Sequence, residues 1–449
     1  MNVLRTPTDR RAPIALETDI LVVGGGAAGV AAAVTAARQG LRVVLLERYG
    51  FCGGGAVAGL SGTICGMYEA SNDPNARPNQ IVHGFLDEFV QHLSDRGGLT
   101  PPVRYGKTFT RVHDPLAWRE TADLLLRDAG VQVLLHTVVT EALVEGSERI
   151  DGIVAYTKEG PLSVRARVTI DASGDADVVA MAGLPTFVGQ DGRVQNPTMI
   201  FRLGGVDVEK FLSAYGPDSI MGPEVTELIL RLHNSHEYRL PRAKIFLFPT
   251  PRAKELLCNC TRVLGRDGRD LNPLLVRDMT EAEIEGRAQV REYARFFKDH
   301  LAGCEESFVN DTGVQVGVRQ TRQVRGKAIL SNGDVARGAK FRSGIARSPW
   351  PIELHTGDKP RLVWLTNDYY EVPLDCFLPE RGEGLLVAGR CLSAEHEAMA
   401  SARVTAQCFS YGHAVGHAAA IAVKERILPR VVDALEVRKC LNLEDARLD

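Results

Sequence analysis

Three glycines near the N-terminus have the spacing of a turn that binds phosphate groups. Gly24, Gly26 and Gly29 form a GxGxxG pattern between an apolar run and an alanine-rich run. In a strand-to-helix turn the first glycine permits the tight bend, the second lets backbone amides approach a diphosphate, and the third lets the helix pack against the strand. The helix N-terminus adds unpaired N–H groups and partial positive charge. The chemistry that this spacing predicts is the binding of a dinucleotide.

The flanking segments supply the elements that such a turn needs. Residues 19–23 (DILVV) predict a short buried strand, residues 30–38 predict a helix that Gly40 ends, and residues 41–46 (LRVVLL) predict a second buried strand. Glu47 follows that strand, where a carboxylate can accept hydrogen bonds from ribose hydroxyls. Together they form a βαβ unit of about 30 residues. A glycine-rich turn in another kind of α/β protein is the alternative.

The uncharged run at residues 20–37 has two other interpretations, a membrane span or a signal peptide. Glu17 and Asp19 adjoin its apolar start, it contains several glycines, and its second half is mostly alanine. These features favour a buried parallel strand followed by a closely packed helix. We therefore predict no membrane partner.

Composition and cysteine spacing exclude further classes of partner and cofactor. The 449 residues include 53 Lys and Arg against 56 Asp and Glu, a net charge of -3, so we expect no nucleic-acid partner. A chain of this length is expected to form two or three domains. Its 9 cysteines are scattered and form no CxxC pair, which predicts no zinc or iron–sulfur centre and a reducing cytoplasmic location.

The sequence after the second predicted strand resembles that of a flavoenzyme family. Residues 47–54 (ERYGFCGG) are similar to the acid-plus-double-glycine stretch of FAD enzymes in the glutathione-reductase-like superfamily, and most similar to the family of FAD-dependent oxidoreductases. That family usually has leucine where this chain has Cys52. The resemblance continues through most of the chain, at residues 61–66 (SGTICG), 170–177 (IDASGDAD), 317–322 (GVRQTR), 350–355 (WPIELH) and 386–404. It is specific for the fold and for FAD, and poorly specific for the substrate.

The resemblance implies an α/β fold in which a Rossmann-like FAD-binding domain with a parallel sheet is joined to an α+β substrate domain. The FAD-binding domain is expected at residues 19–185 and 380–425, the substrate domain at 186–379, and a C-terminal extension at 426–449. The local pattern predicts further elements. These are a strand at 131–135, an antiparallel meander at 141–170, strands at 198–203 and 385–389, and helices at 115–129, 222–233, 280–302 and 405–424.

The family's FAD site carries over to matching positions of this chain. The implied cofactor-binding residues are Gly24, Gly26, Ala28, Gly29, Glu47, Arg48, Gly53, Gly54, Val138, Ala172, Gly174, Asp175, Gly389, Arg390, Arg403 and Val404. The resemblance places the N-terminus of the 405–424 helix at the pyrimidine edge of the flavin, where its amides would stabilise negative charge. The alternative is an ordinary amphipathic terminal helix.

Candidate catalytic residues follow from the same segments. His355 and His396 are predicted bases, because histidine titrates near neutral pH and both follow strands expected to meet the flavin. Arg319 and Arg322 could hold a carboxylate substrate or the flavin edge, or form a structural ion pair between domains.

Three other side chains near these segments have two interpretations each. Tyr369 and Tyr370 could line the pocket or belong to the core. Cys52 could be a flavin attachment point, a redox thiol or a small buried hydrophobe.

The predicted function is the oxidation of a small organic molecule at a C–N or C–O bond by hydride transfer to FAD. Only one dinucleotide pattern is present, so the electrons are expected to pass to dioxygen or to a separate acceptor. Three alternatives stay open: flavin-dependent monooxygenation or halogenation, a non-catalytic electron-relay subunit, and a thiazole-synthase-like role, for which no adjacent sulfur-donor motif is evident. A homo-oligomer is also left open.

Overall fold

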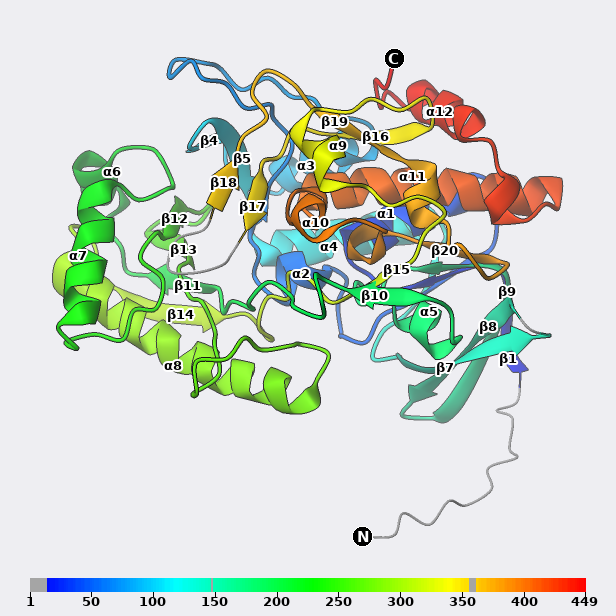
Figure 1. Cartoon of the computed structure of the whole chain (residues 1–449), viewed down its shortest axis with the longest axis horizontal. Coiled ribbons are helices and arrows are strands. Elements are labelled where there is room, and N and C mark those ends of the chain that lie inside the picture. Colours follow the sequence, from blue (N-terminus) through cyan, green and yellow to red (C-terminus); the bar gives the residue numbers. More distant parts are fainter. Residues whose placement is uncertain (1–13, 147, 355–360) are drawn as a thin grey trace, which may run out of the picture.

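A mostly parallel sheet, assembled from strands that are far apart in the chain, forms the larger part of the molecule. The computed structural model describes residues 14–146, 148–354 and 361–449 (Figure 1). The sheet has the order β6-β2-β1-β9-β8-β7, and β20 pairs with β9 outside this path. Its strands are β1 (Ile14–Val23), β2 (Val43–Leu46), β6 (Gln132–Leu134), β7 (Val138–Glu145), β8 (Arg149–Thr157), β9 (Gly160–Asp171) and β20 (Leu385–Val387). The chain therefore has an α/β fold with a Rossmann-like parallel sheet.

The parallel core of this sheet is most deeply buried at β2 and β20 and in the second half of β1. β1 pairs in parallel with both β2 and β9, and β20 pairs in parallel with β9, so the C-terminal ends of these strands share one edge. The edge carries the turn at Gly24, and the segments after Asp171 and Val387. The antiparallel meander predicted at 141–170 is confirmed as β7, β8 and β9.

Two alanine-rich helices pack on the sheet and on each other. They are α1 (Ala27–Arg38) and α11 (Thr405–Glu425), and most of their residues are buried. At the crossing, an added Cβ on Gly412 would lie 2.0 Å from the carbonyl oxygen of Ala28, so only glycine allows this approach. The neighbouring helices are α3 (Phe85–Asp95) and α4 (Pro115–Asp128). Asp114 caps α4 by accepting hydrogen bonds from the Leu116 and Ala117 amides at 2.7 and 3.2 Å.

A second, antiparallel sheet with its own hydrophobic core lies at the other side of the molecule in Figure 1. Its strand order is β12-β13-β11-β14, and three helices pack around it. The strands are β11 (Phe201–Gly204), β12 (Phe246–Pro249), β13 (Glu255–Asn259) and β14 (Phe308–Thr312), and the helices are α6 (Val208–Tyr215), α7 (Pro223–Asn234) and α8 (Val276–His300). This mixture is the α+β region that the sequence predicts.

Small sheets, short helices and 3-10 turns make up the other elements of the described chain. Small sheets pair β5 (Thr108–Val112) with both β3 (Thr63–Ile64) and β4 (Val103–Tyr105), β10 (Thr186–Val188) with β15 (Arg322–Val324), β16 (Gly344–Ser348) with β19 (Tyr370–Pro373), and β17 (Ile352–Leu354) with β18 (Arg361–Val363). The short helices are α2 (Gly54–Val57), α5 (Asp177–Met181), α9 (Asn332–Ala336), α10 (His396–Ala402) and α12 (Ala434–Leu443), with 3-10 turns η1 (Leu374–Phe377), η2 (Gly389–Cys391) and η3 (Pro429–Val431). The predicted domain boundaries remain predictions.

The structure shows where the long helix α8 begins and what the uncharged run at 20–37 forms. The helix predicted at 280–302 begins at Val276, so the predicted start is wrong. Thr280, at the predicted start, lies inside the helix, where its hydroxyl donates to the carbonyl oxygen of Val276 at 2.7 Å. The uncharged run at 20–37 forms the end of β1 and most of α1. In the described parts of the chain, every helix is too short or too polar to cross a bilayer.

Candidate functional site

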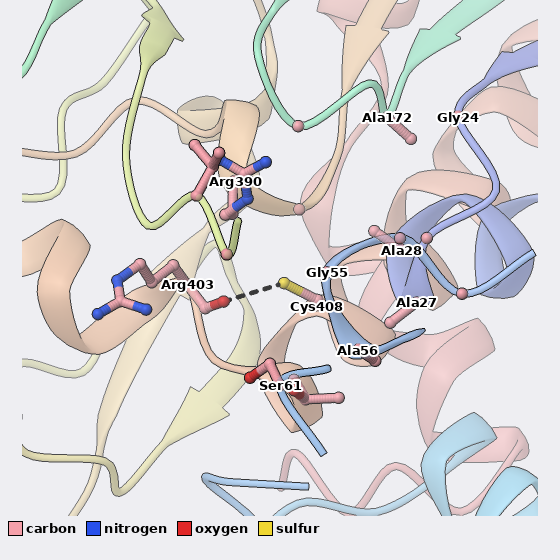
Figure 2. A pocket seen from close by; sticks show the side chains of 18 of the residues that line it. Gly24, Ala27, Ala28, Gly55, Ala56, Ser61, Ala172, Arg390, Arg403 and Cys408 are labelled. Atoms are coloured by element: carbon pink, nitrogen blue, oxygen red, sulfur yellow. Dashed lines mark hydrogen bonds between the residues drawn. The ribbon is translucent and has the colours of Figure 1, made fainter. Parts of the chain in front are cut away.

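A long cavity opens at the edge where the parallel strands end. It is lined by the N-terminal turns of α1 and α11, by the loop around Gly54, and by residues of the antiparallel sheet (Figure 2). One cavity therefore extends from the predicted dinucleotide turn to residues of the antiparallel sheet.

The turn after β1 has no room for side chains. Gly24 has φ +103°, and an added Cβ would lie 2.4 Å from the carbonyl oxygen of Ala172. An added Cβ on Gly29 would lie 1.8 Å from the carbonyl oxygen of Gly24, which is the close helix–strand packing that the sequence predicts. Gly26 caps α1 and no side chain caps this N-terminus, so its first amides lie at the cavity without a side-chain acceptor.

A second glycine loop faces this turn. Gly54 has φ +48°, and an added Cβ on it would lie 2.8 Å from the Cα of Gly26. Figure 2 shows Gly55 and Ala56 of this loop near Ala27 and Ala28 of α1. Backbone and very small side chains thus form both walls, which suits a diphosphate that must approach main-chain donors.

Glu47 is held rigidly at the end of β2. Its carboxylate accepts hydrogen bonds from the Gly25 amide at 2.7 Å and the Tyr49 amide at 2.9 Å. Burial raises the pKa of Glu47, while these amide hydrogen bonds act in the opposite direction. The side chain also lines the cavity, so its remaining lone pairs can accept ribose hydroxyls.

Arg390 brings an unpaired donor to the cavity. Its Nη1 is buried and has no hydrogen-bond partner among the described residues, while Nη2 lies 3.5 Å from the Asp175 carboxylate. Gly174 has φ +84°, and an added Cβ on it would lie 2.5 Å from Nη2 of Arg390. A buried guanidinium nitrogen beside a glycine-lined cradle is the arrangement expected for an anionic or carbonyl-bearing ligand.

The N-terminus of α11 closes the next part of the cavity. Val404 is the N-cap and provides no capping side chain. The Ala406 amide donates to the carbonyl oxygen of Cys65 at 3.0 Å, so the Thr405 amide is the one that lies at the cavity without a side-chain acceptor. Cys408 donates to the carbonyl oxygen of Arg403 at 3.4 Å, the dashed line in Figure 2. In the same view the Arg403 side chain extends away from the glycine cradle.

The far wall of the cavity is polar and comes from several sheets. Tyr105 ends β4, Asn259 ends β13 and Glu353 lies in β17. The Tyr105 hydroxyl donates to Oε1 of Glu353 at 2.9 Å, and burial raises the pKa of Tyr105 well above its usual value. Arg319 reaches this wall because paired backbone hydrogen bonds hold its segment beside Thr198.

Comparison with known proteins identifies the family. The sequence matches the family described as FAD dependent oxidoreductase over residues 19–441. The chain belongs to the FAD-dependent oxidoreductase family. FAD is therefore the cofactor, and the glycine cradle, the Arg390 donor and the two open helix N-termini fit it.

The curated relatives of this FAD-dependent oxidoreductase share less than a third of the aligned residues with it. A thiamine thiazole synthase of Methanococcus vannielii is 28% identical over 174 residues, which are 37% of this chain and 59% of that protein. One of Aeropyrum pernix is 28% identical over 243 residues, covering 51% of this chain and 77% of that protein. The chain thus matches about three fifths of the length of the first of these relatives.

Comparison with solved structures gives matches of low identity. A geranylgeranyl bacteriochlorophyll reductase-like protein of Thermoplasma acidophilum aligns at 15% identity and TM-score 0.48, covering 97% of this chain and 89% of that one. The flavin-dependent brominase Bmp2 aligns at 13% identity and TM-score 0.49, covering 95% and 84%. Similarity at this level does not indicate which reaction the oxidoreductase catalyses.

The predicted cofactor-binding residues are gathered around one cavity. All of them line it except Gly29 and Asp175. Gly29 packs against the Gly24 backbone, and Asp175 accepts a hydrogen bond from the Thr321 hydroxyl at 2.6 Å, so both support the lining from behind. Contact of each residue with FAD remains a prediction.

The predicted catalytic residues are separated by the fold. Arg319 lines the cavity, whereas His396 begins α10 and is not among the lining residues. His355 lies outside the described residues. Arg322 donates to Asp175 and forms an ion pair with Asp177, which is the structural alternative that the sequence left open for it.

Of the remaining candidates, Cys52 and Tyr370 lie in the core and Tyr369 is half-buried. Cys52 is fully buried and outside the cavity lining, and burial raises the pKa of its thiol. Tyr370 is fully buried and its hydroxyl lies 2.8 Å from Oγ of Ser401, and neither Tyr369 nor Tyr370 lines the cavity. Cys65 and Cys408 do line it, and burial raises the pKa of each thiol to about 12. Sequence reasoning did not select these two cysteines, Tyr105, Asn259 or Glu353.

One group away from the cavity has the composition of a metal site. Potential ligand atoms of His413, His417 and Glu444 lie within 4.8 Å of one another, the only such group found in the described parts of the chain, where the sequence predicted no metal ligands. The Phe85 amide donates to Nδ1 of His413 at 3.5 Å, which favours a proton on Nε2, 2.6 Å from the Glu444 carboxylate. This arrangement favours a hydrogen-bonded tie over a metal centre.

Proposed function

We propose that this FAD-dependent oxidoreductase is a dehydrogenase or oxidase that oxidises a small organic molecule at a C–N or C–O bond. The observation that carries the proposal is the continuity of one cavity from the glycine cradle at α1 to the polar wall formed by Tyr105, Asn259 and Glu353. A cofactor in the cradle and a substrate against that wall would share the space between them. Bound FAD supplies the acceptor for a hydride, and the protein supplies positioning and proton transfer.

The chain's own groups have separate roles in holding the cofactor. The amides of the α1 N-terminus and the loop at Gly54 would bind the diphosphate, and Glu47 would accept the ribose hydroxyls. Val138, at the same end of the cavity as Glu47, is proposed to contact the adenine through its backbone. The Thr405 amide, which follows Val404, would face the pyrimidine edge, where the partial positive charge of α11 favours negative charge.

Oxidation at a carbon beside an N–H or O–H group also releases a proton. The carbon loses a hydride to FAD, the nitrogen or oxygen loses a proton, and dioxygen or a separate acceptor later takes the two electrons. Glu353 is the carboxylate on the far wall, and the hydrogen bond from Tyr105 orients it. We propose that Glu353 accepts the proton and that Arg319 orients the substrate. His355 and His396 remain proposed bases from sequence, and His396 lies outside the cavity lining.

The test is an anaerobic screen of the FAD-loaded protein for small amines, amino acids, alcohols and hydroxy acids that bleach the flavin. We expect at least one such compound to bleach it, and Glu353→Gln to slow bleaching by about 100-fold or more without loss of FAD. Alanine variants at His355 and His396 are measured beside it; parental rates in both would remove the two histidine roles. Protein that stays colourless and fails to retain FAD after reconstitution would contradict the whole proposal.

The other functions give different results in the same experiments. NAD(P)H consumption coupled to oxygen or halide insertion would indicate a monooxygenase or halogenase. Flavin that is reduced only by a partner protein would indicate an electron relay. Reoxidation of the bleached enzyme by air distinguishes an oxidase from a dehydrogenase.

A further inference from the structure

The far wall of the cavity carries more positive than negative charge. Arg319 and Arg403 line it, and Arg242 lies behind Asn259, to whose side-chain oxygen its Nη1 donates at 2.9 Å. Arg242 and Arg319 are only 3% and 7% exposed. Burial lowers the pKa of Arg319 well below its usual value, and the charges of Arg403 and Arg242 lower it further, while Glu353 raises it. The three guanidinium groups therefore repel one another in a desolvated region.

The hydrogen bonds at this wall leave donors without acceptors. Nε of Arg403, Nη2 of Arg242 and Nε2 of Gln195 are buried and have no partner among the described residues. Arg319 donates through Nη1 to the backbone carbonyl of Asn196 at 2.7 Å, a neutral acceptor. The Glu353 carboxylate favours the charged form of all three guanidinium groups. Three desolvated positive charges around one carboxylate are still costly, so a native protein that keeps them together usually binds something that offsets the cost.

We propose that this wall is a subsite for a carboxylate group of the substrate, held by Arg319 and Arg403. A guanidinium is planar and matches a carboxylate through two parallel N–H···O bonds, so the pair would gain both charge balance and the missing acceptors. The inference rests on the proposed function, because the substrate must lie between this wall and the flavin. It narrows the substrate class to carboxylic acids whose C–N or C–O bond can reach Glu353, such as amino or hydroxy acids.

An alternative role of the three arginines predicts a different result for anion binding. If the guanidinium groups served only to stabilise electrons arriving at the cofactor, the oxidised enzyme would have no preference for anions. A carboxylate subsite instead exists before any electron transfer. Binding to the oxidised, FAD-loaded protein therefore separates the two, and it requires no turnover.

The experiment compares acids with amides of the same shape. FAD-loaded protein is titrated with acetate and butyrate, and in parallel with acetamide and butyramide, followed by calorimetry and by the flavin difference spectrum. We expect the acids to bind and to perturb the spectrum, and the amides to bind about tenfold or more weakly, since one ion pair with paired hydrogen bonds is lost. Equal binding of acids and amides, or no binding of either, overturns the proposal.

Variants assign the binding to this wall. Arg319→Gln and Arg403→Gln are each expected to weaken acid binding about tenfold or more, and Arg319→Lys to weaken it less because the charge remains. Arg325→Gln is the matched control, an exposed arginine in the same segment that lies over the Phe187 ring and outside the cavity. If Arg319→Gln fails to fold, Arg403→Gln decides. Wild-type affinity in the folded variants would contradict the proposal.

The two proposals can fail separately. FAD content is measured on every sample, and loss of FAD retention in the parent protein would remove the proposed function. Protein that keeps FAD and is bleached only by uncharged substrates would remove the carboxylate subsite and leave the oxidoreductase assignment intact.

Discussion

At Gly24 both the backbone and the surrounding space exclude a side chain. The residue has φ +103°, and an added Cβ would lie 2.4 Å from the Ala172 carbonyl oxygen. Gly24→Ala must therefore displace either the turn or the segment after β9. We expect it to lose FAD on gel filtration and to lower the free energy of unfolding by about 2 kcal/mol or more. FAD absorbance per protein and urea unfolding measure the two effects.

Gly40 provides the matched control for that substitution. It also has positive φ, +80°, but nothing lies within 4 Å of an added Cβ. Gly40→Ala thus carries only the backbone strain, about 1 kcal/mol, and should retain FAD. Equal losses in both variants would mean that strain alone, and not the crowded phosphate turn, explains the effect at Gly24.

Residues of the cradle could be predicted because their reasons are local. Gly24 and Glu47 follow from the strand–turn–helix pattern around them. Tyr105 and Asn259 could not be predicted, since they end strands of two different small sheets and meet only through long-range packing. Glu353 lies inside a segment that resembles the family, so its signal was present, but the histidine two positions later titrates nearer neutral pH and is the stronger candidate base from sequence alone.

At the scale of elements, a shared carboxylate ties the C-terminal helix to the rest of the fold. Glu444 follows α12, and its carboxylate lies 2.6 Å from Nε2 of His413 and 3.3 Å from Nε2 of His417, both on α11. Burial would raise the pKa of Glu444, but the two histidines outweigh it and hold the pKa well below its usual value. The sequence predicted only a C-terminal extension here, because a pairing between α11 and a residue beyond α12 leaves no local pattern.

Removing that charge tests the tie. Glu444→Gln keeps the shape but weakens the hydrogen bond to His413, and the buried histidine rings lose their anionic partner. We expect the free energy of unfolding to fall by about 1 to 3 kcal/mol and the amides of α12 to exchange faster. Glu425→Gln, at the exposed end of α11, is the control and should change stability by less than about 0.5 kcal/mol. Similar losses in both variants would show that Glu444 does not hold α12.

At the scale of the whole molecule, the two sheets were easier to predict from the sequence than the cavity wall that lies between them. The parallel sheet combines strands from both ends of the chain, because β20 adds to β9 at the edge that carries the cradle. The returning apolar run at 385–389 made this pairing predictable by resemblance. The antiparallel sheet presents its own residues to the cavity through register and twist, and these depend on which faces the helices α6 to α8 bury. The polar far wall is therefore a property of the assembled structure.

The global stability of the fold should depend on pH through one buried histidine, His113. His113 precedes α4, is 3% exposed and packs on Trp118 with ring centroids 4.5 Å apart. Burial lowers its pKa from 6.5 to about 4 in the folded protein. Between pH 6.5 and about 4 the unfolded chain binds a proton at His113 and the folded protein does not. The contribution of His113 to stability is therefore fully present above pH 6.5 and is lost as the pH falls through that value toward 4. Acidification from pH 7 to 5.5 should cost about 1 kcal/mol through this residue.

His113→Gln removes the titrating group, and urea unfolding at the two pH values should show a correspondingly smaller difference. His92→Gln, at a partly exposed position of α3, should keep the parental difference. If His113→Gln also keeps it, the acid sensitivity of the fold arises elsewhere.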